Sequence, residues 1–153
     1  MLGKTIGDLE TGDVFEPIRY TVTPFICSEY AHAMEDPAEI YYSSATPLGR
    51  QVRPPTMIHA DKMRILEANC NDERRVAGVH TDDARIHYEY SAKQHSLAYV
   101  GEELVVSGRI VERYTKRGRD YLYYELKVET AEGRLVTTYN DRTLLSYRPN
   151  EEK

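Results

Sequence analysis

Apolar residues recur every three or four positions over one stretch of the chain, residues 56–70. The recurring residues are Met57, Ala60, Met63, Leu66 and Cys70, with Ile58 and Ile65 widening the stripe. This spacing places them on one face of a helix. Pro54 and Pro55 keep the preceding chain out of the helix, and Thr56 is placed to cap its first turn. The pattern predicts a helix from Thr56 to Cys70, about 22 Å long at 1.5 Å per residue.

Alternation of apolar and polar positions predicts strands over most of the remaining chain. The predicted strands cover residues 13–23, 82–93, 103–115, 120–130 and 134–147. In the second of these, alternation puts Ile86, Tyr88 and Tyr90 on one face and Arg85, His87 and Glu89 on the other. Turns at 116–119 and 131–133 join the last three strands as hairpins. Residues 25–35 show helical spacing and predict a short helix.

The predicted strands are unusually long for a globular domain, where about five or six residues are common. Long strands coil rather than lie flat. An antiparallel sheet that coils around one long helix is a hot-dog fold. We therefore predict an α+β protein with a single hot-dog domain over residues 1–153. Its sheet edges and outer face are incompletely covered, so we expect a partner subunit.

Composition excludes several classes of protein. The net charge of −5 argues against nucleic acid and anionic membrane surfaces as partners. No apolar run approaches the roughly 20 residues of a membrane span, and the first residues lack the design of a signal peptide. Cys27 and Cys70 have no metal-ligand spacing, and we expect both to be reduced and buried in a cytoplasmic protein. Thirteen tyrosines, with two phenylalanines and no tryptophan, suit a half-buried sheet face or a subunit interface.

One short segment, residues 36–39, has the pattern of a helix start. Asp36 occupies the cap position, Pro37 the first helical position, and Glu39 is placed to reach back. The turn that it opens carries Ile40 and Tyr41. A capping role is sufficient to explain Asp36 from the residues alone.

Four short motifs in their order resemble the MaoC-like hot-dog family, which comprises hydratases and dehydratases of acyl thioesters. The opening Gly12-Asp13-Val14-Phe15 is similar to the family's GDxF, and residues 21–36 resemble its TVT…I…FA…GD run. The stretch 52–57 is similar to the APPT step before the central helix, and residues 100–104 resemble xxGDxL. The resemblance covers nearly the whole chain and is strongest to the N-terminal half of MaoC dehydratases.

The resemblance implies a site on residues 36–41, where the family carries D-x-N-P-x-H. Asp36 is present, Ala38-Glu39 replaces Asn-Pro, and Tyr41 replaces His. By this resemblance Asp36 holds and polarises the water that is added to or removed from the acyl chain, and Tyr41 donates or orients a proton. The replacement bears on catalysis, because imidazole both takes and gives a proton near neutrality whereas a phenol, with a pKa of about 10, takes one poorly.

The resemblance also implies a site for the thioester carbonyl at the start of the central helix. Negative charge on that oxygen needs fixed donors, and backbone N–H groups provide them in the family. Pro55 has no N–H, so the donors are expected from Thr56 or Met57, with help from the helix dipole. An ordinary helix start has the same features. No cofactor and no metal site is expected.

Other polar residues have simpler explanations beside the functional ones. His59 and Asp61 lie in the first two turns of the predicted helix. Asp61 lies where another hot-dog dehydratase branch carries an acidic residue, but charge near a helix N-terminus also explains it. His80 and His87 flank the second long strand and have the character of surface histidines. The basic turn 116–119 could meet the phosphates of coenzyme A or simply be solvated.

These observations leave two main hypotheses for function. In the first, the chain is a hydratase or dehydratase of an acyl-CoA or acyl-carrier thioester. In the second, it is a catalytically degenerate subunit that shapes the acyl tunnel of an active hot-dog partner. Binding of a thioester without turnover is a third. The partner chain is expected to be a second copy or another hot-dog protein.

Overall fold

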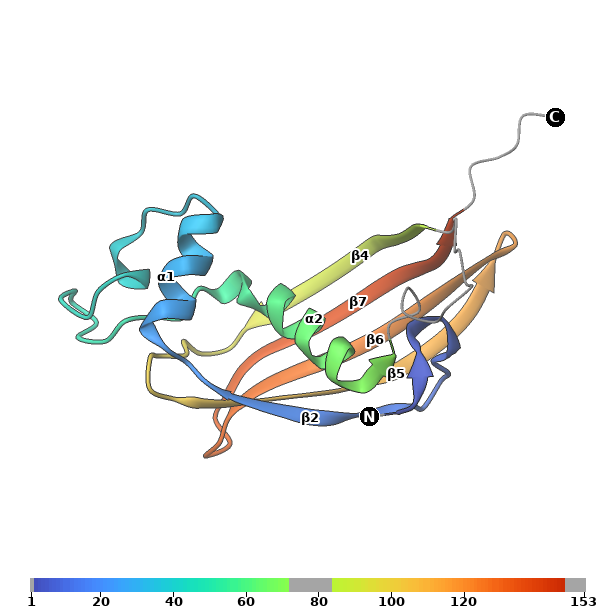
Figure 1. The fold of residues 1–153 in the computed structure, drawn as a ribbon, viewed down its shortest axis with the longest axis horizontal. Helices are drawn as coiled ribbons and strands as arrows, with labels where there is room; N and C mark the ends of the chain where they lie inside the picture. The colour runs from blue at the N-terminus through green and yellow to red at the C-terminus, as the bar shows by residue number, and fades with distance from the viewer. Residues whose placement is uncertain (1, 72–83, 148–153) are drawn as a thin grey trace.

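Long strands and two helices account for most of the chain in the computed structural model, which describes residues 2–71 and 84–147 (Figure 1). The strands are β1 (Lys4–Thr5), β2 (Val14–Thr21), β3 (Cys70–Asn71), β4 (Ala84–Gln94), β5 (Glu103–Lys116), β6 (Arg119–Thr130) and β7 (Leu135–Tyr147). The helices are α1 (Pro24–Ala33) and α2 (Ile58–Asn69), with short 3₁₀ turns at Ile6–Asp8, Glu39–Tyr41 and Pro55–Met57. The predicted strand and helix positions are confirmed to within a few residues, apart from the start of the strand predicted at 82, because residues 82 and 83 lie outside the described ranges.

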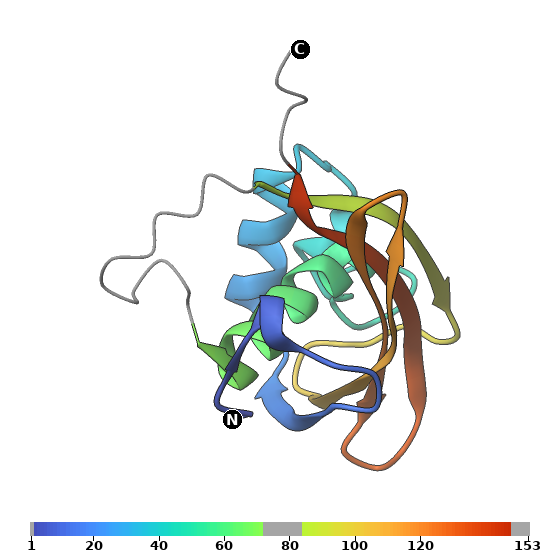
Figure 2. The ribbon, with the colours of Figure 1, turned by 90° about the vertical axis from the view of Figure 1, so that its right-hand side faces the viewer.

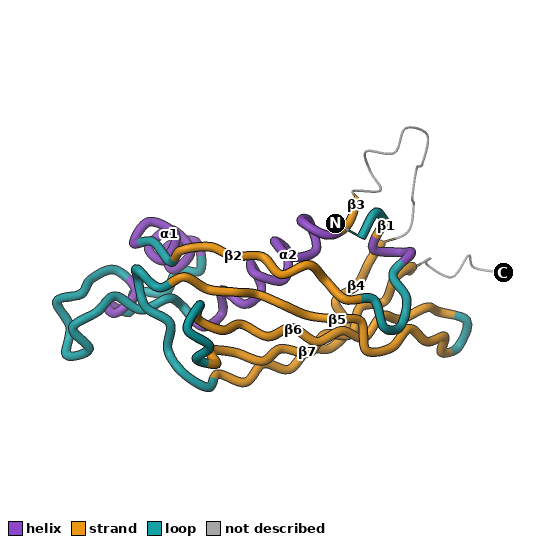
Figure 3. Tube along the Cα trace, turned by 90° about the horizontal axis from the view of Figure 1, so that it is seen from below, coloured by secondary structure: helices purple, strands orange, loops and turns teal. Residues whose placement is uncertain are grey.

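Five strands form one antiparallel sheet in the order β2-β5-β6-β7-β4. The sheet curves around α2, which lies on its concave side (Figures 2 and 3). β2 and β4 are its two edges, so the sheet does not close into a barrel. This confirms the predicted α+β hot-dog fold. No helix among the described residues is long and apolar enough to cross a membrane.

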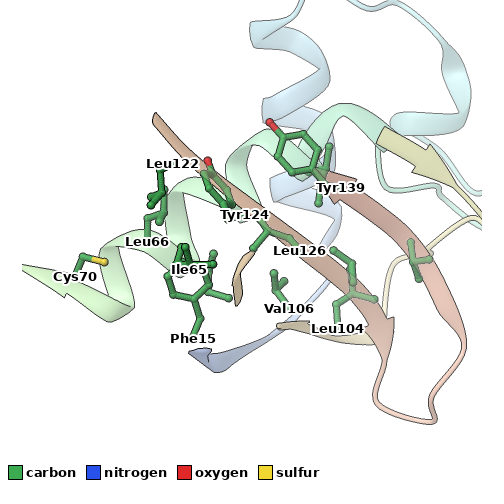
Figure 4. Packing of buried hydrophobic residues seen from close by; sticks show 14 of the residues in the cluster. Phe15, Ile65, Leu66, Cys70, Leu104, Val106, Leu122, Tyr124, Leu126 and Tyr139 are labelled. Carbon is green, nitrogen blue, oxygen red and sulfur yellow. The ribbon is translucent and has the colours of Figure 1, made fainter. Parts of the chain in front are cut away.

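The core lies between α2 and the concave face of the sheet (Figure 4). Its side chains are apolar and nearly all inaccessible to water: Phe15, Ile65, Leu66, Leu104, Val106, Ile110, Leu122, Leu126 and Val128. Burial of one such side chain contributes about 1.5–3 kcal/mol. The expectation that both cysteines are buried is also confirmed, since Cys27 and Cys70 both lie in the core.

The buried face of α2 is not the stripe that spacing alone indicated. Met63 is 51% exposed, whereas Asp61 and Asn69 are fully buried. Asn69 belongs inside because it bonds β2: its amide nitrogen donates to Glu16 O at 3.0 Å, and its oxygen accepts from Glu16 N at 2.8 Å. Thr56 does not cap the helix either, because a 3₁₀ turn (Pro55–Met57) precedes α2 and Met57 takes the cap position.

Asp61 is buried because Arg53 is buried against it. Both side chains have no exposed area, and the Arg53 Nη2 group contacts Asp61 Oδ2 directly. Tyr20 of β2 completes the set: its hydroxyl donates to Asp61 Oδ1 at 2.8 Å and accepts from Arg53 Nε at 2.9 Å. Burial opposes the charge on Arg53, but the Asp61 carboxylate and Tyr20 together outweigh it, so the pKa of Arg53 is raised. This triad joins β2, the segment before α2, and α2 itself.

Strand β4 departs from regular alternation at two bulges. His87 pairs with Thr143 and Glu89 with Arg142, so β4 has one extra residue there. Another irregularity lies between Ala84 and Ile86. As a result Tyr90 shares a face with His87, with ring centroids 5.2 Å apart, while Tyr88 packs on Tyr121 of β6. The prediction that Tyr88 and Tyr90 share a face opposite His87 is therefore wrong.

The first residues make a pairing that the sequence pattern did not indicate. β1 runs parallel to β3, with Lys4 opposite Cys70 and Thr5 opposite Asn71. Leu2 N also donates to Asn69 O at 2.9 Å. A two-residue strand is too short for an alternating pattern, so only the structure shows it.

We predict that Gly108→Ala destabilises the sheet by about 1–3 kcal/mol. An added Cβ would lie 2.5 Å from Glu125 O and 2.4 Å from Leu126 Cδ2, and the backbone oxygen cannot turn away. Urea unfolding measures the loss. Ser107→Ala on the same strand is the control, expected within about 0.5 kcal/mol of wild type. An unchanged midpoint for Gly108→Ala would contradict the close β5–β6 approach.

We also predict that Asp61→Asn costs about 3–5 kcal/mol, because it leaves the Arg53 charge buried without its partner. The double variant Arg53→Met/Asp61→Leu should lose less than the single one, since no charge then remains inside. Glu89→Gln, which breaks the exposed Arg142–Glu89 pair, should cost less than about 1 kcal/mol. Equal losses for Asp61→Asn and Glu89→Gln would argue against the buried pair.

Candidate functional site

The segment 36–41 follows α1 and turns back sharply. Asp36 N donates to Ala31 O at 2.9 Å, and Asp36 Oδ1 accepts from Ala38 N at 3.0 Å. The expected helix with Asp36 as its cap does not form. Instead a single 3₁₀ turn begins after Ala38, whose methyl group cannot cap it. The Asp36 carboxylate therefore has only this one hydrogen bond among the described residues, and its second oxygen stays available.

Tyr41 lies near Asp36 and is half-buried. Burial raises the pKa of the Tyr41 phenol, and the negative charge of Asp36 adds to the effect. The phenol thus stays protonated through the neutral range and can donate a hydrogen bond or a proton. Tyr42 stabilises the same turn, because its hydroxyl donates to Asp36 O at 2.9 Å.

Several hydrogen bonds hold this segment and α1 to the chain that leads into α2. Val52 N donates to Ile40 O at 2.8 Å, and Gln51 Nε2 donates to Tyr41 O at 2.7 Å. The Tyr30 hydroxyl of α1 donates to Thr56 O at 2.8 Å. Gln51 is itself buried, so its contact with Tyr41 is shielded from water. The sequence-predicted site residues Asp36, Tyr41 and Thr56 consequently belong to one bonded unit at one end of the sheet.

The amides at the start of α2 are not equivalent. Met57 N donates to Pro54 O at 3.1 Å, and Ile58 N donates within the same 3₁₀ turn. Pro55 has no N–H. The Thr56 amide makes no hydrogen bond with any residue that the structure describes. Two backbone N–H donors were expected from the sequence, those of Thr56 and Met57. The N–H of Thr56 is therefore the one that can donate to a ligand oxygen.

The other sequence candidates lie elsewhere. Both oxygens of Asp61 are occupied by Tyr20 and Arg53, which makes it a structural residue rather than a substitute carboxylate. The basic turn between β5 and β6 lies at the opposite end of the sheet from α1 (Figures 1 and 3). His80 lies outside the described residues.

A second polar cluster, which sequence reasoning missed, surrounds Asp141 of β7. The carboxylate is fully buried on the concave face and accepts from the Tyr139 hydroxyl at 2.6 Å and the Thr143 hydroxyl at 2.8 Å. Lys62 of α2 donates at 3.3 Å. One signal was present in the sequence: an acidic residue at an inward position of an interior strand needs partners. The bulge in β4 that brings His87 to Asp141 could not be recognised in the sequence.

Comparisons with known proteins agree on one family. The family described as "FAS1-like, dehydratase domain region" matches residues 10–139, well over half of the chain. No curated protein matches the sequence. Many solved structures share the fold at low sequence identity.

Three of these structures cover nearly the whole chain. A MaoC-like dehydratase from Rhodospirillum rubrum has a TM-score of 0.70 at 18% identity, covering 96% of this chain and 99% of its own. The HadBC (3R)-hydroxyacyl-ACP dehydratase complex from Mycobacterium tuberculosis has a TM-score of 0.70 at 16% sequence identity. The match covers 91% of this chain and 99% of the other. An (R)-hydratase from A. caviae involved in PHA biosynthesis has a TM-score of 0.65 at 14% sequence identity. The match covers 89% of this chain and 96% of the other. With its hot-dog sheet, its proline-led helix and the family match over residues 10–139, the chain belongs to the FAS1-like dehydratase region of the MaoC-like hot-dog family.

Proposed function

We propose that this chain, as a single hot-dog domain over residues 1–153, hydrates or dehydrates an acyl thioester carried by coenzyme A or an acyl carrier protein. The observation that carries the proposal is the bonded unit of the 36–41 segment and the start of α2. Hydrogen bonds join the segment that carries Asp36 and Tyr41, and α1 before it, to the chain that leads into α2, and this supports a common site for the three groups. The hydratase and dehydratase structures with the same fold support the reaction class.

Each group has one part in this proposal. The Thr56 amide, aided by the helix dipole, binds the thioester oxygen as charge builds on it. Asp36 holds the water that adds to C3 or leaves from it. Tyr41, with its raised pKa, gives a hydrogen bond or a proton and is a poor base. No cofactor takes part in this chemistry.

The state of Tyr41 also favours a second candidate function. Because a half-buried phenol beside a carboxylate accepts protons poorly, the chain could have lost turnover and kept its fold. It would then complete a heteromer with an active hot-dog partner, as the two-chain HadBC complex has the same fold. The open edge at β4, with Ile86, Tyr88 and Tyr90 exposed, is the surface that we propose for that partner or for a second copy.

Activity of the purified chain on a short 2-enoyl-CoA tests the first candidate. We expect measurable hydration that falls by about 10²–10⁴-fold in Asp36→Asn, because the variant holds water without a charge. Glu39→Gln, an exposed acid on the same turn, is the matched control and should keep full activity. Tyr41→His should raise turnover by restoring an imidazole.

Two outcomes would change the assignment. Turnover by Asp36→Asn equal to wild type would remove Asp36 from the site. An inactive chain that gains activity only with a co-encoded hot-dog partner would establish the subunit function.

The role of the Thr56 amide has a separate test. Semisynthesis with the α-hydroxy analogue of threonine at position 56 replaces the amide N–H by an ester oxygen and keeps the side chain. We expect kcat to fall about 10²–10³-fold, the usual effect of losing one oxyanion donor. Thr56→Ala keeps the N–H and should be nearly as active as wild type. If the ester variant retains full kcat, the carbonyl is bound elsewhere.

A further inference from the structure

His87 is held by the buried Asp141 cluster. Its Nε2 atom lies 2.8 Å from Asp141 Oδ2 and 3.3 Å from the Tyr139 hydroxyl. That hydroxyl donates to Asp141, and burial together with this bond raises the pKa of Tyr139, so the phenol keeps its proton. His87 therefore meets two oxygens on one ring nitrogen, and both belong to the same strand, β7.

These contacts fix the tautomer of His87. A lone pair on Nε2 would face a carboxylate oxygen at 2.8 Å, which is repulsive, so Nε2 carries the proton. In the neutral imidazole the Nδ1 atom then has the lone pair. It makes no hydrogen bond with any described residue, and the His87 side chain is 34% exposed. A buried carboxylate that orients a partly exposed imidazole is the arrangement that prepares histidine for proton transfer.

The side chains described around His87 place no competing charge at its Nδ1 atom. His59 of α2 lies with its ring centroid 6.1 Å away, and burial, with Lys62 and His87 nearby, lowers the pKa of His59 so that it is neutral near pH 7. Lys62 is turned to Asp141 at 3.3 Å. Tyr90 of the same strand covers the cluster from outside, with its ring 4.9 Å from His59.

His59 connects this cluster with the start of α2. Its ring centroid lies 6.1 Å from that of His87, and its backbone lies in the first turn of α2, directly after the 3₁₀ turn that contains Thr56. From this arrangement we infer that His87, oriented by Asp141, is the acid–base group for an acyl thioester whose carbonyl lies on the Thr56 amide. The inference rests on the proposed function, and it supplies the imidazole that position 41 lacks.

The proposed step adds water with full balance. His87 Nδ1 takes a proton from water as the water oxygen bonds C3 of the 2-enoyl thioester. The electron pair of C2=C3 moves toward C1, and the charge on the carbonyl oxygen is held by Thr56 N–H. C2 then takes the proton back from Nδ1, the carbonyl re-forms, and the imidazole returns to neutral. Dehydration runs the same step in reverse.

Two measurements on the full chain test this inference. Nitrogen NMR of ¹⁵N-histidine protein reports the tautomer: we expect protonated Nε2 at His87 in wild type, lost in Asp141→Asn. Addition of butyryl-CoA, a saturated thioester that cannot react, should shift the His87 ring signals and leave those of the exposed His95 unchanged. A proton on Nδ1, or no shift at His87, would overturn the inference whether or not the chain is active.

Kinetics give the second arm. His87→Gln should lower kcat for 2-enoyl-CoA hydration at least 100-fold with little change in KM, because it removes the group that takes the proton from water. His95→Gln is the control with wild-type rates expected. Thermal unfolding checks that both variants fold. Wild-type kcat in a folded His87→Gln would overturn the inference.

The two proposals fail in distinguishable ways. Turnover that needs Asp36 but not His87 would keep the hydratase and reject the role of His87. A chain without turnover, whose His87 signals still shift with butyryl-CoA and follow Asp141, would reject the hydratase function of the chain alone and keep the thioester beside His87.

Discussion

A guanidinium and a carboxylate that are both withdrawn from water decide where α2 begins. Arg53 is tied by its backbone N–H to Ala98 O at 2.8 Å and by its side chain to Asp61 and Tyr20. Its Nη1 group has no hydrogen-bond partner among the described residues, so the pair is not a simple gain in free energy. What it provides is position: the two prolines, the 3₁₀ turn and the Thr56 amide follow directly from this anchor.

The same principle operates on the far side of α2. Asp141 is buried on the concave face of the sheet, and hydroxyl groups of β7 and Lys62 of α2 satisfy its oxygens. Two buried carboxylates thus bracket the first turns of the helix, Asp61 on the β2 side and Asp141 on the β7 side. The core of a hot-dog fold is largely apolar. The buried charged groups at the start of α2 therefore distinguish this end of the helix from the remainder of the core. The proposed chemistry lies where these polar contacts concentrate.

The sequence was sufficient for the architecture because long alternating strands and one proline-led helix allow few arrangements. It failed where polar residues are buried. Spacing placed Met63 on the buried face of α2, and the structure places Asp61 and Asn69 there. Asp61 is held by Arg53 and by Tyr20 of β2, and Asn69 by Glu16 of β2, and a hydrophobic pattern does not show such polar partners. Alternation also failed in β4, since a bulge leaves no trace in a hydrophobic pattern. Asp36 and Tyr41 were found only through the family resemblance, and the residues alone indicated a cap that does not form.

The order of strands in the sheet has a consequence for how the chain reaches this state. β2 precedes the other four strands of the sheet in the sequence, yet its neighbour among the described strands is β5, with Val14 opposite Arg109 and Thr21 opposite Glu103. Contacts between segments so remote in sequence close large loops and slow folding. During synthesis β2 therefore leaves the ribosome with a strand edge that stays unpaired until β5 has been made, and an unpaired edge is open to aggregation in that interval.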